Sequence, residues 1–100
     1  SKQPINVGEL VTFRAAVNHV GRTSMEIGIR VEAEDIRKGT RRHTNSCYFT
    51  MVAMGDDGKP AQVPELKILT EIEEKRNRAA GVRRRLRRQF SEELQKASEG

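Results

Sequence analysis

The sequence contains a single cysteine, no tryptophan and few other aromatic residues. Because only 4% of its residues are aromatic, the chain must build its core from aliphatic side chains. One cysteine excludes an internal disulfide and favours a reducing compartment, so we expect a cytoplasmic protein. Cys47 lies in an apolar segment, where a small buried hydrophobe is a better interpretation than a nucleophile.

No run of apolar residues is long enough to span a membrane, and no signal peptide opens the chain. We therefore expect no membrane partner. A hundred residues make one small domain or part of one. The chain opens with Ser rather than Met and a strand pattern follows almost at once, so we interpret the N-terminus as processed or truncated.

The chain is basic, with a formal net charge of +5. This excess attracts nucleic acid, phosphorylated ligands or acidic surfaces without choosing among them. Arginines crowd positions 83–88, which indicates either contact with phosphate or nucleic acid, or a solvated helix face balanced by Glu92 and Glu93. Nucleic-acid recognition usually adds aromatic stacking, which the few core-like aromatics here do not provide.

Two segments alternate between apolar and other residues, which is typical of strands with one buried and one wet face. They span Leu10–Asn18 and Ser24–Glu34, and Gly21 between them makes a hairpin plausible. A third strand is predicted for Arg42–Met54. Because it carries apolar residues on both faces, we expect a central strand. Asp57-Gly58 predicts a turn, and Val63, flanked by prolines, predicts a short edge segment.

A helix is predicted from Thr70 onward, where Thr70 and Glu73 form a capping box. Apolar residues then recur at helical spacing and form an amphipathic stripe. Gly81 lies within the helix, and we expect a weak point or a break there. The stripe comprises Ile72, Ala79, Val82, Leu86, Phe90, Leu94 and Ala97. This charged helix cannot alone cover three strands, so we expect further cover from upstream residues or a partner chain.

Few residues have the chemistry of a catalytic centre. His43, at a strand entrance, is the best candidate for a base or a phosphate ligand, although a partly exposed strand-end histidine is the alternative interpretation. His19 lies in a predicted turn, and Asp56 and Asp57 are better explained by turn formation. Two distant histidines and one cysteine do not make a zinc site, and no glycine-rich phosphate loop is present.

Several blocks in one register resemble the hotdog-fold acyl-coenzyme A thioesterases, of the bacterial broad-chain-length type related to cytosolic acyl-CoA hydrolases. The blocks are INVGELV, SMEIGIRVEA, RHTNSCYFTMVA, DGKP and VPEL, within roughly Pro4–Leu66. The resemblance implies an α+β, partial hotdog fold in which antiparallel strands and a C-terminal helix are present. The family's first strand and its wrapped helix would be absent from this chain.

The resemblance implies hydrolysis of a fatty acyl-CoA to a fatty acid and coenzyme A, without a further cofactor. In the family the wrapped helix carries the catalytic carboxylate, and no residue here matches it. We therefore expect no catalytic residue and no turnover from this segment alone. The implied partners are acyl-CoA and further copies of the chain, as a dimer of hotdog units or a trimer of dimers. Nucleic acid, bound through the arginine-rich helix of a non-catalytic module, is the alternative.

The resemblance also implies a path for coenzyme A along two clusters of short polar and basic residues. One comprises Arg22, Thr23, Ser24 and Met25, and the other comprises His43, Thr44 and Asn45, expected near the same mouth. Arg22 is the first choice for a phosphate contact, because a guanidinium can make two parallel hydrogen bonds to phosphate oxygens. We expect residues 1–66 to belong to the thioesterase domain and 67–100 to form a charged helical extension.

Overall fold

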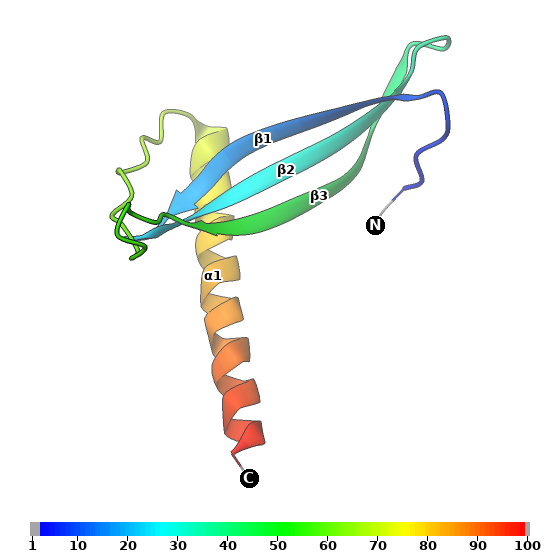
Figure 1. Cartoon of the computed structure of the whole chain (residues 1–100). Helices are drawn as coiled ribbons and strands as arrows, with labels where there is room; N and C mark the ends of the chain where they lie inside the picture. The colour runs from blue at the N-terminus through cyan, green and yellow to red at the C-terminus, as the bar shows by residue number, and fades with distance from the viewer. Residues whose placement is uncertain (1–2, 100) are drawn as a thin grey trace.

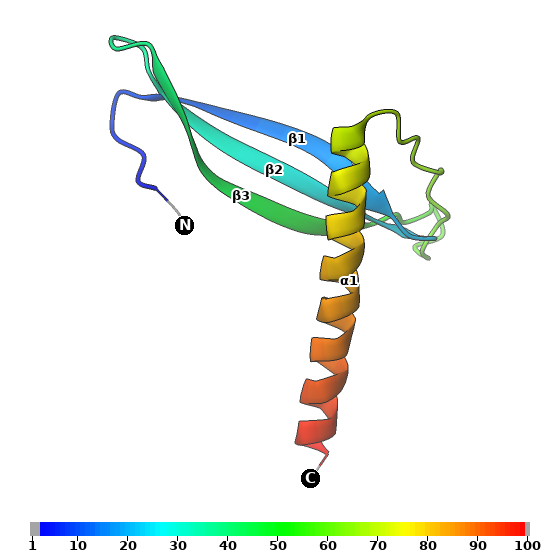
Figure 2. The same cartoon turned by 180° about the vertical axis from the view of Figure 1, so that it is seen from behind.

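Three antiparallel strands and one long helix make up the computed structural model, which describes residues 3–99 (Figure 1). Strands β1 (Leu10–Val20), β2 (Ser24–Asp35) and β3 (Thr40–Val52) form a sheet in the order β1-β2-β3. Helix α1 (Glu71–Ser98) crosses the sheet near one end and then extends away from it (Figures 1 and 2). In the described part of the chain, no helix combines the length and apolar character needed to cross a bilayer.

The β1–β2 hairpin and the strand pattern of β2 are confirmed. Met25 lies opposite Val20 and Ile29 lies opposite Ala15, so the apolar residues of both strands share one face. The middle strand of the sheet, however, is β2 and not β3, which corrects the sequence interpretation. Apolar residues appear on both faces of β3 because Tyr48 lies under the helix, while its neighbours belong to the opposite face.

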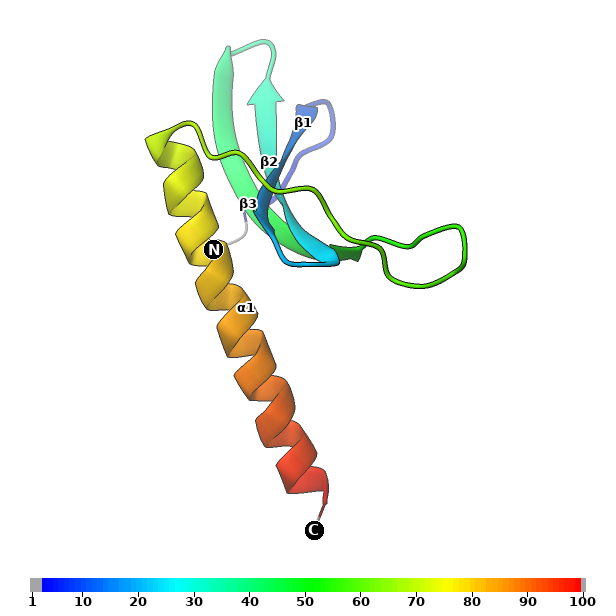
Figure 3. The same ribbon diagram turned by 90° about the vertical axis from the view of Figure 1, so that its left-hand side faces the viewer.

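The apolar face of the sheet stays largely uncovered in the described residues. Phe13, Phe49 and Met51 are 69%, 51% and 55% exposed. The helix lies instead against the face that carries Glu26 and Gly28, which the alternation pattern had marked as solvent-facing. Figure 3 shows the helix running beside this face and leaving it at its C-terminal half.

Two irregularities interrupt the ladders, and each exposes backbone groups to other partners. In β1 the register shifts between Val17 and His19, which leaves Asn18 as the extra residue of a bulge. In the β2–β3 ladder the shift after Val31 leaves Thr44 unpaired. The Thr44 hydroxyl lies 3.2 Å from the Val31 carbonyl oxygen and donates to it, so the side chain satisfies an acceptor that the bulge releases.

The loop tips are built on glycine: Gly39 in the β2–β3 loop and Gly58 in the predicted Asp57-Gly58 turn take positive φ angles of 68° and 76°. His19, expected in a turn, lies within β1 instead. Residues 61–69 form no strand, which corrects the expected edge segment, although the buried Val63 donates its amide to the Arg22 carbonyl at 2.8 Å. This hydrogen bond, with the one that the Ala61 amide donates to the Ala53 carbonyl at 2.8 Å, holds the start of the segment beside the β1–β2 turn.

The helix begins where the sequence places it. The Thr70 hydroxyl accepts a hydrogen bond from the Glu73 amide at 3.1 Å, which confirms the Thr70 cap, whereas the Glu73 carboxylate accepts from the Thr70 hydroxyl at 2.9 Å and not from the backbone amide that a capping box requires. Contrary to expectation, α1 runs unbroken through Gly81 to Ser98. The cost of one glycine, about 1 kcal/mol relative to alanine, is too small to end a helix that is capped and anchored to the sheet.

Gly81→Ala is expected to raise the free energy of unfolding by roughly 0.5–1 kcal/mol, because the site is helical and an added Cβ would meet nothing within 4 Å. Urea denaturation followed by circular dichroism measures the change. Gly39→Ala is the matched control, since its positive φ predicts a loss of stability instead. A Gly81→Ala protein less stable than the parent would show that α1 bends at this position in solution.

Candidate functional site: the helix–sheet junction and the two polar clusters

An ion pair buried beneath α1 organises the junction of helix and sheet. One edge of the Arg83 guanidinium donates two hydrogen bonds to the Glu26 carboxylate, with Nε–Oε2 at 3.0 Å and Nη2–Oε1 at 2.7 Å. The Arg83 guanidinium also stacks on the Tyr48 ring, 3.7 Å from its centroid. Because the Glu26 side chain is only 6% exposed, this charge depends on Arg83 for compensation.

The bulge residue Asn18 completes the network. The side-chain Nδ2 of Asn18 donates to Glu26 Oε1 at 3.0 Å. The backbone carbonyl of Asn18 accepts from the side-chain Nδ2 of Asn77 at 3.1 Å. Gly28, opposite on β2, leaves the space for this side chain, since a Cβ there would collide with the Asn18 amide. Two helix residues thus hydrogen-bond to neighbouring strands, Asn77 to β1 and Arg83 to β2.

The junction borders an open cavity of about 490 Å³ that is strongly basic. Arg14 and Arg30 line this cavity and both pair with Glu32, at 2.5 Å from Arg14 Nε to Oε1 and 3.9 Å from Arg30 Nε to Oε2. Lys75 and Arg76, which also line it, make no ion pair with any described residue. The cavity therefore carries excess positive charge and suits an anion. The arginine run signalled basic character, but the sequence could not show which arginines turn toward the sheet.

Hydrogen bonding by Arg83 lowers the pKa of Glu26 below its ordinary value of 4.5, and Asn18 acts in the same direction against the effect of burial. The same contact raises the pKa of Arg83. Both shifts mean that the charged forms are the stable ones at the junction. The Glu26 carboxylate is therefore a structural anion and is not available as a base.

The first predicted cluster, residues 22–25, lies at the β1–β2 turn. Arg22 is exposed, and Thr23, Ser24 and Met25 are half-buried. The backbone of this cluster is fixed by three hydrogen bonds of 2.8 Å, made by its carbonyls with Val63, Ala53 and Gly21.

A second cation stands beside this turn. The guanidinium of Arg84 lies directly against Gly21, where any Cβ would collide with it. The sequence alone did not pair Arg84 with Arg22, because 61 intervening residues separate them and only the docking of α1 brings them together.

The second predicted cluster lies elsewhere in the chain. Ser24 pairs with Val52, whereas Asn45 pairs with Val31 seven residues further along β2, roughly 23 Å at about 3.3 Å per residue. Within one chain the two clusters therefore do not share a mouth, which corrects that expectation.

Members of the second cluster differ in accessibility. His43 is exposed, with its Nε2 2.9 Å from the Ser46 hydroxyl. Thr44 is 1% exposed, and its hydroxyl is hydrogen-bonded to the Val31 backbone carbonyl. Its side chain therefore stabilises the bulge and does not face solvent. Asn45 is half-buried and donates to the Cys47 sulfur at 3.5 Å.

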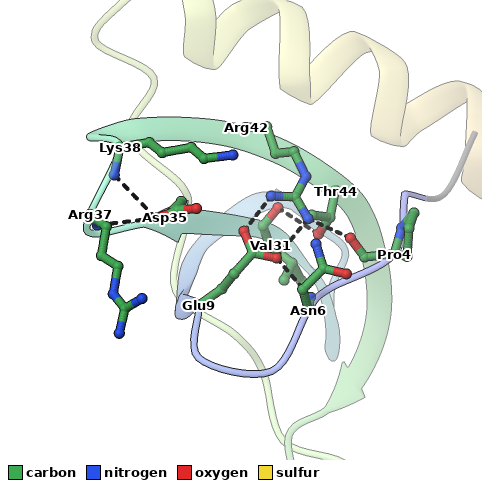
Figure 4. A network of polar contacts seen from close by, with 9 residues as sticks. All are labelled: Pro4, Asn6, Glu9, Val31, Asp35, Arg37, Lys38, Arg42 and Thr44. Atoms are coloured by element: carbon green, nitrogen blue, oxygen red, sulfur yellow. Dashed lines mark hydrogen bonds and ion pairs between the residues drawn. The ribbon is translucent and has the colours of Figure 1, made fainter.

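The surroundings of the second cluster are built by the N-terminal segment (Figure 4). Arg42 binds the Glu9 carboxylate through its two terminal nitrogens, Nη1 to Oε2 and, at 2.9 Å, Nη2 to Oε1. Its Nη2 also donates to the Pro4 carbonyl at 2.5 Å. Hydrogen bonding by Arg42 and then by the Asn6 amide lowers the pKa of Glu9 to about 2. This contact fixes residues 3–9 beside β3, next to His43.

Other candidates are structural. Asp57 accepts from the Lys59 amide at 3.0 Å and so belongs to the predicted turn. His19 lies at the end of β1, opposite Glu26 in the register. Among residues 3–99, no three His, Cys, Asp or Glu side chains gather closely enough to hold a metal ion.

Comparison with known proteins finds relatives of one kind. Residues 2–40 match the Thioesterase superfamily. Protein VdlD of Helicobacter pylori is 50% identical over 86% of this chain and 49% of its own length. The chain therefore spans about half the length of this curated relative. The chain is similar to members of the thioesterase superfamily, and its sheet and helix match part of the fold of solved acyl-CoA thioesterases.

Solved structures agree with this assignment. An apo-hexameric acyl-CoA thioesterase is 35% identical, with a TM-score of 0.80 over 85% of this chain and 55% of that one. An acyl-CoA hydrolase from Staphylococcus aureus, solved with butyryl coenzyme A, coenzyme A and coenzyme A disulfide, is 26% identical. Its TM-score is 0.80 over 99% of this chain and 62% of that one. The strands and the helix are thus both shared with this protein.

Acidification is expected to weaken the junction. Because the pKa of Glu26 is lower in the folded state, its stabilising contribution is complete above about pH 4.5 and is lost as the pH falls through the lowered value. The free energy of unfolding, measured by urea titration from pH 7 to pH 3, should fall more steeply in the parent protein than in Glu26→Gln. Glu9 and Glu32 titrate in both proteins and cancel in the difference. Parallel pH profiles would contradict the role of Glu26.

Proposed function

We propose that the full-length protein hydrolyses fatty acyl-CoA thioesters to a free fatty acid and coenzyme A, and that residues 3–99 supply part of the coenzyme A groove and the oligomer surface. The observation that carries the proposal is the β1–β2 hairpin, which falls within the superfamily match and presents Arg22 at its exposed turn. The hydrolase from S. aureus, solved with coenzyme A, supports the same ligand class.

Coenzyme A phosphates are proposed to bind at this turn. Arg22 is free to reach solvent while its backbone is held by Val63, so its guanidinium can approach a phosphate without disturbing the hairpin. Arg84 lies one residue away against Gly21 and adds a second positive charge. Two cations at one turn suit a pyrophosphate better than a single carboxylate, and guanidinium groups bind phosphate oxygens in pairs. Thr23, Ser24 and Met25 are proposed to flank the pantetheine arm.

His43 and Asn45 are proposed to contact coenzyme A bound to a neighbouring copy. Within one chain they lie at the far end of the sheet from Arg22, so one ligand on one copy does not bring both clusters together. Thr44 is enclosed and would act through the bulge that positions its neighbours. This arrangement requires a homo-oligomer, proposed as a dimer of hotdog units or a trimer of such dimers.

The chemical step is proposed to use groups from outside these residues. Glu26 is held as an ion pair, Glu9 is bound by Arg42, and neither is placed to activate water. The resemblance assigns the catalytic carboxylate to the helix that the hotdog sheet wraps, and the exposed apolar face around Phe13 and Phe49 is proposed to receive that helix. We propose that no metal or further cofactor takes part and that residues 3–99 alone do not turn over.

Nucleic-acid binding through the arginine run is not favoured by the structure. Arg83 is paired with Glu26, and Arg84 lies against Gly21. The run is therefore partly used to attach α1 to the sheet.

Arg22→Ala in the full-length protein is expected to raise KM for acyl-CoA roughly tenfold and leave the fold intact, because one charge-assisted phosphate contact is lost. Release of free coenzyme A thiol from acyl-CoAs of several chain lengths measures the effect. Arg37→Ala is the matched control, since Arg37 is exposed at the β2–β3 loop and carries the same charge. Unchanged KM values in Arg22→Ala would remove Arg22 from the groove, and absence of thioester cleavage by the parent protein would refute the proposed function itself.

A further inference from the structure

The basic cavity beneath α1 has a floor and a roof of small residues. In the register of the sheet Ala16 lies opposite Gly28, and both line this cavity of about 490 Å³. Ala79 lines it from the helix. Because none of these residues carries more than a methyl group, the space between α1 and this part of the sheet stays unfilled. A small ligand can therefore enter between helix and sheet.

Two arginines of the sheet face each other beside this floor. Arg14 on β1 lies directly opposite Arg30 on β2, and Ser46 on β3 completes the same row. Like charges in directly opposite positions destabilise a sheet. Glu32 supplies only one carboxylate for the two arginines, whose side chains remain 58% and 51% exposed. The row therefore has room for a further anion.

The helix brings two more cations to the other wall. Lys75 and Arg76 both line the cavity, both are exposed, and neither pairs with a carboxylate among the described residues. Arg83 also lines the cavity, but its charge is compensated by Glu26. Apart from this pair, four cations from β1, β2 and α1 surround the space, and the carboxylate of Glu32 offsets them only in part.

This charge balance favours a ligand with more than one negative charge. A carboxylate carries a single charge, whereas a phosphate monoester carries about 1.5 to 2 at pH 7. Guanidinium groups bind phosphate oxygens in pairs, and lysine binds them as a point charge. The exposed Ser46 hydroxyl, 2.9 Å from His43 Nε2, adds a neutral hydrogen-bonding group to the arginine row. The cavity volume falls within the range of small-molecule sites, roughly 300–1,000 Å³.

The cavity is separate from the turn at which coenzyme A phosphates are proposed to bind. Along β2 the chain passes from the turn at Ser24, through Glu26 with its buried ion pair, to the cavity floor at Gly28. The ion pair thus lies between the two places. Arg22 and Arg84, the cations of the turn, are not among the residues that line the cavity.

We propose that the cavity between α1 and the polar face of the sheet binds a small phosphorylated molecule through a phosphate monoester or pyrophosphate group. Lys75 and Arg76 hold the anion from the helix, and Arg14 and Arg30 hold it from the sheet. The bound anion bridges α1 and the sheet and so adds to the contacts of the junction. This site does not depend on the proposed thioester hydrolysis.

Titration calorimetry of the full-length protein with inorganic pyrophosphate tests the site. The double variant Lys75→Gln, Arg76→Gln is expected to bind pyrophosphate at least roughly tenfold more weakly, because charge-assisted hydrogen bonds are lost. Arg78→Gln, Arg85→Gln is the matched control: it removes the same charge from exposed positions of α1 outside the cavity, and should change the affinity less than about twofold. Equal losses in the two double variants, or no binding to the parent protein, would overturn the proposal.

Filling the cavity tests its shape apart from its charge. Ala79→Leu keeps every cation and places a larger side chain at an exposed helix position that lines the cavity. The affinity for pyrophosphate is expected to fall severalfold, while circular dichroism shows unchanged helix content. Undiminished binding would show that the anion is held by the basic surface in general and not by this cavity.

Coenzyme A carries a pyrophosphate of its own, so a further titration distinguishes the two sources. Arg22→Ala is expected to bind inorganic pyrophosphate as the parent does, because Arg22 does not line the cavity. Saturating coenzyme A is expected to leave the affinity of the parent for pyrophosphate unchanged. Displacement of pyrophosphate by coenzyme A, or loss of binding in Arg22→Ala, would place the anion in the coenzyme A groove and overturn the separate site.

Discussion

The rest of the structure depends on the ion pair between Glu26 and Arg83. A buried carboxylate near the start of β2 would be costly under a helix unless a cation reached it, and Arg83 reaches it with two hydrogen bonds. This pair, with Asn18 and Asn77, brings α1 to the polar face of the sheet. The apolar face is thereby left exposed, and it is the face on which we propose that a helix from outside these residues packs.

Functional geometry follows from the same contact. Once Arg83 is fixed on Glu26, the next helix residue, Arg84, falls against Gly21 and places a second cation beside Arg22. The sheet residue that anchors the helix therefore also shapes the proposed phosphate site. The ionised carboxylate serves here as an anchor for arginine, and we propose that the hydrolytic chemistry uses groups from outside these residues.

Local rules predicted most of the fold, because strand alternation, the Thr70 cap and the turn glycines act over a few residues. They failed where tertiary contacts decide the outcome. The strand pattern predicted a solvent-facing Glu26, which is buried, and Gly81 predicted a weak point or a break in a helix that is continuous. The two clusters expected at one mouth are seven positions apart, since the pairing of β3 with β2 is not visible in either segment alone. The docking of Arg83 and Arg84 depends on contacts between residues far apart in the chain, which no local pattern predicts.

The central claim is that Glu26 and Arg83 act as a unit, and a double-mutant cycle tests it most directly. The free energy of unfolding is measured for the parent, Glu26→Gln, Arg83→Gln and the double variant by urea denaturation at pH 7. We predict a coupling energy of about 1–3 kcal/mol, with the double variant less destabilised than the sum of the singles. Single effects that add to within about 0.3 kcal/mol would show that the pair does not hold the helix to the sheet.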